Sequence, residues 1–234
     1  MKTIRGVLWD NDGVLVNTEQ LFYESNRTLL LPYGIDLTPK QFFDWFLDNH
    51  YGAWHLLLAQ GHPVALVDRL RAERGVLFGQ RLRQATNLAV PGMALLLLQL
   101  QQLQPQVRMG VVTSAYAEHF RLSHARTGLA GHFNFVLARE DYANSKPAPD
   151  GYLAGLSRLG LPAADCVAVE DSPRGLRAAN AAGLECIVLR NAMNRHYAFD
   201  DAFCVVESVA ELGGVLASFM PPSGRAGRSL EYAL

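Results

Sequence analysis

The sequence predicts an α/β fold: a doubly wound, Rossmann-like parallel sheet with an inserted all-helical domain. Short apolar runs alternate with helical stretches along most of the chain, whereas one long segment shows helical patterns only. Continuous apolar strands are typical of a parallel sheet that is covered on both faces. The alternation of strands and helices indicates the doubly wound arrangement of that sheet.

The expected strands of this core are short and mostly apolar. They cover residues 4–10, 107–113, 133–137, 166–170, 186–189 and 204–206. The helices expected between them cover residues 92–103, 115–127, 150–159 and 173–182. Helices of this kind can pack on the two faces of one open sheet.

A long strandless segment lies between residues 17 and 88, where apolar residues recur at helical spacing. It starts after the first strand and ends at the turn signal Val90-Pro91-Gly92. We therefore expect residues 17–88 to form a helical cap inserted into a core of residues 1–16 and 89–220, followed by a loosely held tail at 221–234. Its expected helices cover residues 21–31, 41–48, 53–60 and 63–85.

Composition argues against several classes of partner. Half of the 234 residues are hydrophobic, and the formal charge is −1. The chain therefore lacks the excess of basic residues that would favour nucleic acid or an anionic membrane as its partner. The most apolar run, residues 93–100, is far shorter than the ~20 residues that span a bilayer. The apolar run at the N-terminus is too short for a secretory signal. Cys166, Cys186 and Cys204 lie in or beside apolar runs, which favours reduced thiols and a cytoplasmic location.

Two carboxylates stand where the first expected strand ends. Asp10 occupies the carboxyl end of that strand, where α/β sheets carry their functional groups, and Asp12 follows two residues later. Such a pair can act as nucleophile and proton donor, or it can bind a hard cation through oxygen. The stretch Asp-Asn-Asp-Gly is also favourable in a solvated turn, so the pair alone leaves both interpretations open.

Polar residues also lie at the end of the expected strand 107–113 and in the loop that follows the expected strand 133–137. Thr113 and Ser114 precede a helix whose free N–H groups can bind phosphate, although either hydroxyl can simply cap that helix. Lys146 lies in a loop with two prolines and offers a point charge for phosphate, unless it is an ordinary solvated lysine.

Adjacent acids end the fourth expected strand. Glu170 and Asp171 repel each other at the exit of a buried strand, an arrangement that a bound cation stabilises. The alternative is that Asp171 only caps the helix that begins at Pro173.

In this order the motifs resemble those of the haloacid dehalogenase superfamily. The resemblance rests on DNDG at residues 10–13, VVTS at 111–114, KPAPD at 146–150 and VAVEDS at 167–172. The helical insertion after the first motif resembles the small cap domain of that superfamily. Its group of β-phosphoglucomutases and small-metabolite phosphatases is the most similar in pattern.

The resemblance implies a Mg²⁺-dependent enzyme that forms an aspartyl-phosphate. Asp10 would be the nucleophile and a metal ligand, and Asp12 the general acid and base, with its backbone carbonyl on the metal. Asp171 would bind Mg²⁺, and Glu170 would do so directly or through water. Phosphoryl transfer depends mainly on positioning and charge neutralisation, which agrees with these residue types.

The resemblance also implies which residues contact the substrate. Thr113 and Lys146 would hold the transferring phosphoryl group, assisted by the Ser114 N–H. In the cap, Tyr51 and Trp54 are better explained as core residues of the cap than as substrate contacts. The cap residues that we expect to select the substrate are His50, Tyr51, Trp54 and His55.

The cap departs from the mutase pattern, which favours hydrolysis. Phe22 stands where the mutases place a histidine, and residues 48–52 lack the arginine with which they grip a second phosphate. The arginines of residues 63–85 lie in a helix-like run, and we expect them to be solvated. The prediction is thus a phosphomonoester hydrolase for a small phosphorylated metabolite such as a phosphosugar. A β-phosphoglucomutase-type mutase is the alternative, and a non-catalytic phosphate-binding module is less favoured.

Overall fold

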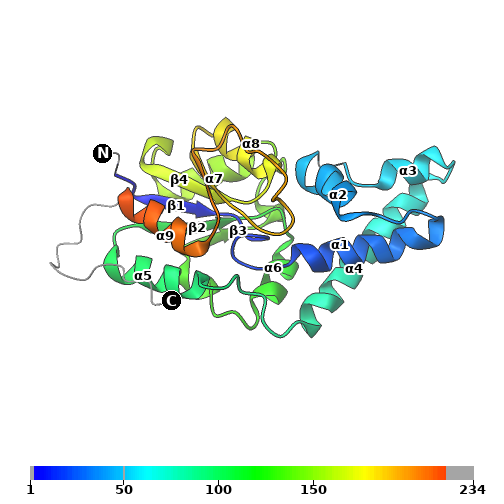
Figure 1. The fold of residues 1–234 in the computed structure, drawn as a ribbon, viewed down its shortest axis with the longest axis horizontal. Coiled ribbons are helices and arrows are strands. Elements are labelled where there is room, and N and C mark those ends of the chain that lie inside the picture. Colours follow the sequence, from blue (N-terminus) through cyan, green and yellow to red (C-terminus); the bar gives the residue numbers. More distant parts are fainter. Residues whose placement is uncertain (1–2, 50, 220–234) are drawn as a thin grey trace.

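The computed structural model describes residues 3–49 and 51–219, and within them a six-stranded parallel sheet with the order β3-β2-β1-β4-β5-β6 (Figure 1). The predicted doubly wound α/β core is therefore confirmed. The strands are β1 (Gly6–Trp9), β2 (Arg108–Val112), β3 (Phe135–Leu137), β4 (Cys166–Glu170), β5 (Glu185–Leu189) and β6 (Cys204–Val206).

The register of the sheet aligns the ends of its three central strands. Trp9 of β1 pairs with Val111 of β2 and with Val169 of β4. The backbone N–H of Asp10 then donates to the Val169 carbonyl at 2.9 Å. The residues that follow β1, β2 and β4 consequently meet at the carboxyl edge of the sheet, where α/β proteins place their sites.

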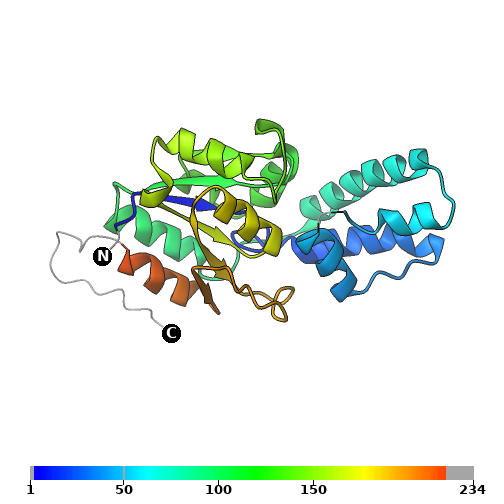
Figure 2. The same ribbon diagram turned by 90° about the horizontal axis from the view of Figure 1, so that it is seen from above.

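Helices cover both faces of this sheet (Figure 2). Because side chains alternate along a strand, Val7 and Trp9 of β1 enter one core while Leu8 enters the other. The first core is closed by α5 (Met93–Leu103), α6 (Ala117–His124) and α9 (Val209–Ser218), and the second by α7 (Asp150–Leu159) and α8 (Pro173–Ala181). The sequence analysis did not identify α9.

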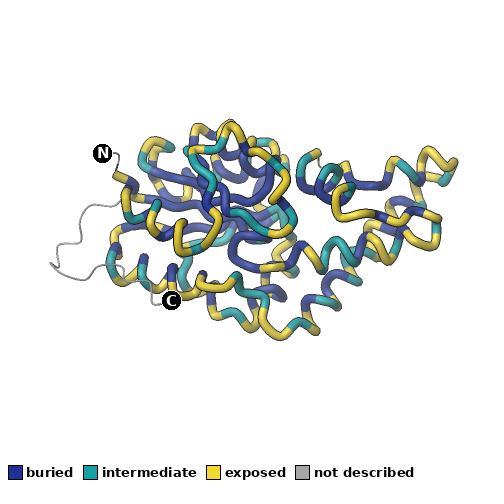
Figure 3. Tube along the Cα trace, in the orientation of Figure 1, coloured by how far each residue is buried: buried dark blue, intermediate teal, exposed yellow. Residues whose placement is uncertain are grey.

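The segment between β1 and α5 is helical, as expected. It contains α1 (Glu19–Leu30), α2 (Pro39–Phe42), α3 (Trp54–Ala59) and α4 (Val64–Gln84), and a π-helix over Phe43–Asp48 continues α2. These helices bury an apolar core of their own, visible in Figure 3 as a second group of buried residues. We keep the name cap for residues 17–88, whose limits stay a prediction.

The cap joins the core through two chain crossings that lie side by side. The Asn17 N–H donates to the Leu88 carbonyl at 2.7 Å, and the Val90 N–H donates to the Leu15 carbonyl at 2.9 Å. Both crossings lie next to the loop of residues 10–16 that follows β1. Any rotation of the cap therefore acts on the chain close to the carboxyl edge of the sheet.

Three further expectations concern the rest of the chain. All three cysteines lie within the described residues and none forms a disulfide there, although Cys204 is only partly buried. No helix in residues 3–49 or 51–219 is long and apolar enough to cross a membrane. The predicted tail, residues 221–234, lies outside the described residues.

Candidate active site

A buried lysine joins two strand ends at the carboxyl edge of the sheet. The Lys146 ammonium donates to Asp10 Oδ1 and to Glu170 Oε1, both at 2.6 Å, and to the Val112 carbonyl at 2.9 Å. These three acceptors match the three protons of an ammonium group. Lys146 is only 2% exposed, which excludes an ordinary solvated lysine.

The protonation of this cluster follows from burial and charge. Burial, followed by the charge of Glu170, raises the pKa of Asp10 to about 7, although Lys146 opposes the shift. Burial alone would lower the pKa of Lys146, but the charges of Asp10 and Glu170 outweigh it and the pKa rises. Lys146 therefore stays cationic beside a carboxyl group that titrates near neutrality.

Both carboxylate oxygens of Glu170 accept hydrogen bonds from the protein. Its Oε1 atom accepts from the Tyr152 hydroxyl at 2.6 Å as well as from Lys146, and its Oε2 atom accepts from the Ser172 hydroxyl at 3.2 Å. A Cβ atom at Gly175 would lie 2.0 Å from the Glu170 carboxyl carbon, so only glycine permits this packing. The structure thus fixes Glu170 as an anchor for Lys146, and its contact with a metal stays a prediction.

Three buried carboxylates form a candidate cation site. Asp10, Glu170 and Asp171 each offer an oxygen, and these atoms lie within 4.8 Å of one another. An oxygen-only donor set suits a hard divalent cation such as Mg²⁺. Burial and the charge of Glu19 raise the pKa of Asp171 well above its usual value, which shows how strongly the site disfavours uncompensated negative charge.

The loop after β1 approaches Asp171 at Gly13. This glycine has a φ of +77°, and a Cβ atom there would lie 1.9 Å from Asp171 Oδ2. Any other residue would be strained in this conformation and would also collide with the carboxylate. Gly13 thereby brings the ends of β1 and β4 together.

Asp12 lies at the wall of the cavity, held by two threonines. Its Oδ1 atom accepts a short hydrogen bond from the Thr18 hydroxyl, and its Oδ2 atom accepts one from the Thr113 hydroxyl at 3.5 Å. Thr113 is fully buried, and its hydroxyl also accepts from the Ala115 N–H at 3.0 Å. Ser114 lines the cavity, whereas contact between Thr113 and a phosphoryl group stays a prediction.

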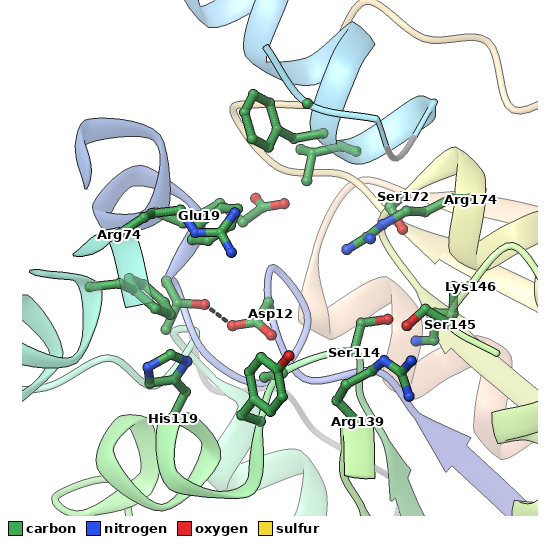
Figure 4. A pocket seen from close by; sticks show the side chains of 18 of the residues that line it. Asp12, Glu19, Arg74, Ser114, His119, Arg139, Ser145, Lys146, Ser172 and Arg174 are labelled. Atoms are coloured by element: carbon green, nitrogen blue, oxygen red, sulfur yellow. Dashed lines mark hydrogen bonds between the residues drawn. The ribbon is translucent and has the colours of Figure 1, made fainter. Parts of the chain in front are cut away.

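A cavity of about 660 Å³ opens between the cap and the carboxyl edge, and its volume suits a small metabolite. Asp10, Asp12, Lys146 and Asp171 line its floor. Figure 4 shows Glu19 and Arg74 of the cap, together with Ser114, Arg139 and Arg174 of the core, around the space in front of Asp12. The carboxylates and cations thus share one cavity.

The four predicted substrate-selecting residues have different outcomes. Tyr51 and Trp54 line the cavity, and Trp54 is also part of the cap core, where it packs against Phe46. His55 does not line the cavity; its Nδ1 atom lies 3.1 Å from the Gly52 carbonyl oxygen, and its ring packs against Tyr51. His50 lies outside the described residues.

Two of the cap arginines, which we expected to face solvent and not the site, line the cavity. They are Arg71, which is exposed, and Arg74, which is half-buried, and they lie one helical turn apart on α4. The Arg74 guanidinium lies 4.8 Å from the centre of the Phe22 ring, and within the described residues its buried Nε has no hydrogen-bond partner. Burial, and then the charge of Arg71, lowers the pKa of Arg74 to about 10.

The sequence analysis did not identify two residues that line the cavity, Glu19 and Arg139, or Asn191, which binds the cavity residue Asp171. Arg139 follows the end of β3 and lines the cavity, while Asn191 follows the end of β5 and donates to Asp171 Oδ2 at 2.8 Å. The rule that functional residues follow strand ends, which identified Asp10 and Glu170, also applies to Arg139 and Asn191. Glu19, at the start of α1, gave no such signal, and burial raises its pKa to about 7.

Comparison with known proteins agrees with this geometry. The chain is 30% identical to Protein CbbY of Cereibacter sphaeroides over 91% of this chain and 95% of that protein. It is 29% identical to the validoxylamine A 7'-phosphate phosphatase of Streptomyces hygroscopicus subsp. limoneus, over 78% of this chain and 84% of the relative. A crystal structure of a CbbY mutant from Rhodobacter sphaeroides, in complex with xylulose-(1,5)bisphosphate, covers 90% of this chain and 97% of its own, with a TM-score of 0.70 and 26% identity.

The family model for haloacid dehalogenase-like hydrolases matches residues 7–189, from β1 to the end of β5. This range contains the cap and all four motifs of the sequence analysis. Together with the relatives it confirms the predicted superfamily and the prediction of an enzyme of the phosphatase class. The chain belongs to the haloacid dehalogenase-like hydrolases.

Proposed function

We propose that the protein is a Mg²⁺-dependent phosphomonoester hydrolase that acts on a small phosphorylated metabolite through an aspartyl-phosphate at Asp10. The observation that carries this proposal is the carboxylate of Asp10, which lines the cavity beside the buried ammonium of Lys146. A carboxylate in such a setting is a nucleophile whose negative charge is partly compensated. The phosphatase among the relatives supports the same reaction class.

Two proton-coupled steps complete the proposed reaction. A carboxylate oxygen of Asp10 attacks phosphorus, the bond from phosphorus to the leaving oxygen breaks, and Asp12 gives its proton to that oxygen. Asp12 then takes a proton from water as the water oxygen attacks phosphorus, which breaks the aspartyl–phosphate bond and releases phosphate. Thr18 and Thr113 fix the Asp12 carboxyl group by their hydrogen bonds, so that one group serves both steps.

The donor set fits a magnesium ion. Asp10, Asp171 and the backbone carbonyl of Asp12 would hold the ion. Glu170 would contact it either directly or through a bound water. When bound, Mg²⁺ supplies positive charge that neutralises the phosphoryl oxygens. The raised pKa values of Asp10 and Asp171 are what such a carboxylate group shows without a cation.

The arginines of the cap support a substrate with a second anionic group. Arg71 and Arg74 face the cavity from α4, opposite the predicted phosphate-binding residues Ser114 and Lys146. The solved CbbY structure holds a sugar bisphosphate, which has the required shape and charge. We therefore propose a phosphosugar with a second phosphate or carboxylate as substrate. The mutase remains the second candidate, because two cap arginines line the cavity and the missing arginine of residues 48–52 therefore argues less strongly against it.

The first test replaces Lys146 by alanine and measures Mg²⁺-dependent release of phosphate from an aryl phosphate. Loss of its charge should reduce kcat at least about 100-fold, the typical cost of removing an electrostatic contact to a transferring group. Lys40→Ala is the matched control, since Lys40 is an exposed cap lysine paired with Asp44. Near-normal turnover of a folded Lys146→Ala protein would contradict the proposal. Rapid conversion of β-glucose 1-phosphate to glucose 6-phosphate, with little phosphate released, would favour the mutase.

A second prediction concerns stability and pH. Asp10 and Glu19 have pKa values of about 7 in the folded protein, above their unfolded values near ~4. In the pH range between the two pKa values the folded state binds more protons than the unfolded state. The contribution of these two groups to the free energy of unfolding is therefore complete below pH ~4 and is lost as the pH rises through about 7. His124, whose pKa burial lowers to about 4, acts in the opposite direction, but it does so between about pH 4 and its unfolded value of ~6.5, mostly below the pH at which Asp10 and Glu19 titrate.

Thermal unfolding with a chelator and with Mg²⁺ tests this prediction. The metal-free protein should lose stability between about pH 6 and about pH 8, and Mg²⁺ should raise Tm more at the higher pH. Asp171→Asn is the control and should remove most of the Mg²⁺ effect. Stability that rises over this pH range, with an equal Mg²⁺ shift at both ends, would show that the carboxylates do not form the cation site.

A third prediction separates the two ends of the substrate. Arg74→Met keeps much of the packing on Phe22 but removes the charge, so KM for xylulose-(1,5)bisphosphate should rise by about 10-fold or more, the worth of one charge-assisted contact. KM for the aryl phosphate should stay within about 2-fold, since that substrate lacks the second anion. Arg69→Met is the matched control, because Arg69 lies on the same helix, is exposed and pairs with Glu73. Equal effects on both substrates would contradict a second anion site.

A further inference from the structure

The loop after β5 is closed by two asparagines that bind each other. The Asn191 N–H donates to Asn194 Oδ1 at 2.9 Å, and the Asn194 N–H donates to Asn191 Oδ1 at 3.2 Å. The Met193 N–H also donates to Asn191 Oδ1, at 2.9 Å. We call Asn191 and Asn194 the asparagine clasp. Each side chain thus caps the backbone of the other residue and leaves its own amide group, Nδ2, to bind elsewhere.

Both free amide groups bind Asp171. Asn191 Nδ2 donates to Asp171 Oδ2 at 2.8 Å, and Asn194 Nδ2 donates to the Asp171 backbone carbonyl at 2.8 Å. Asn194 Nδ2 also donates to the Leu189 carbonyl, at 3.0 Å, which ties the loop to the end of β5. The clasp therefore fixes the carboxylate and the main chain of a proposed metal ligand at once.

The same loop contacts the cap. Asn191 Nδ2 also donates to Glu19 Oε2, at 3.3 Å, so one amide group lies between a carboxylate of the core and one of the cap. Met193 packs against the apolar core of the cap, and the His196 ring lies 4.5 Å from the Phe43 ring, centre to centre. A single short loop thereby links Asp171 to the first turn of α1 and to the π-helix.

We propose that Asn191 is a positioning residue that orients Asp171 for the metal and couples metal binding to the position of the cap. The planar amide has two N–H donors in fixed directions, which suits one carboxylate on each side. A group that holds a metal ligand typically contributes about 10- to 100-fold to metal affinity. Since coupling between two sites is reciprocal, a cap that is held in place must in turn favour metal binding. This inference rests on the proposed function in one respect, that the metal is Mg²⁺.

The variant Asn191→Ser isolates the amide donor. A serine hydroxyl can still accept from the backbone of the turn, as it does in related turns, but it is too short to bridge Asp171 and Glu19. Phe43→Leu probes the other end of the link, because Phe43 contacts His196 and lies in the cap. Asn180→Ser is the matched control: Asn180 lies on α8, and its amide donates to the Asp201 carbonyl at 3.0 Å.

The experiment measures Mg²⁺ affinity by calorimetry on the full chain, together with hydrogen exchange of α1 and the π-helix with and without Mg²⁺. We expect Asn191→Ser to weaken Mg²⁺ binding by about 10-fold or more and to abolish the protection that Mg²⁺ gives to these cap segments. Phe43→Leu should weaken Mg²⁺ binding by a smaller factor, and Asn180→Ser should change neither quantity.

Different results separate the parts of this inference. Unchanged Mg²⁺ affinity in Asn191→Ser would overturn the positioning role. Weakened affinity with unchanged cap protection, or a Phe43→Leu protein with normal affinity, would overturn the coupling. Mg²⁺ binding by the wild type without phosphate release from any phosphoester would overturn the proposed function while leaving the clasp intact. A wild type that binds no Mg²⁺ would overturn both.

Discussion

The contact between the Lys146 ammonium and the carboxylates of Asp10 and Glu170 is the interaction on which the site depends. Unpaired buried charges are costly, and three carboxylates meet at this sheet edge. One ammonium group supplies a counter-charge to Asp10 at the floor of the cavity. It also pairs with Glu170, which would otherwise be a buried carboxylate without a cation beside it.

Close packing makes this contact possible. The strands that deliver the acids are neighbours in register, and glycines at 13 and 175 allow the chain to approach Asp171 and Glu170 more closely than any other residue would. The cap is attached to this core at two adjacent crossings and through side-chain contacts. One of these contacts is made by the loop after β5, which links the candidate cation site to the cap.

The sequence predicted the sheet, most helices and the charged residues at the strand ends, because periodicity and strand-end position are local signals. It did not show which way the arginines of α4 point. Helical spacing identifies a face of α4 but not the cavity that this face meets, so it does not show that Arg71 and Arg74 line the cavity. Asn191 differs from them, because it follows the end of β5 and the strand-end signal applies to it, although its partners Asp171 and Glu19 are distant in sequence. Helix α9 was missed although its apolar residues Val209, Leu212 and Leu216 recur at helical spacing, so the signal for it is present in the sequence.

The central claim is that Asp10 becomes phosphorylated, and trapping of the covalent intermediate tests it most directly. Enzyme mixed with substrate and Mg²⁺ is quenched within one turnover, reduced with borohydride and analysed by peptide mass spectrometry. Reduction of an aspartyl-phosphate converts the residue to homoserine, so we predict that change at Asp10 and none at Asp12 or Asp171. Phosphate release without modification of Asp10, or modification of another carboxylate, would contradict the account.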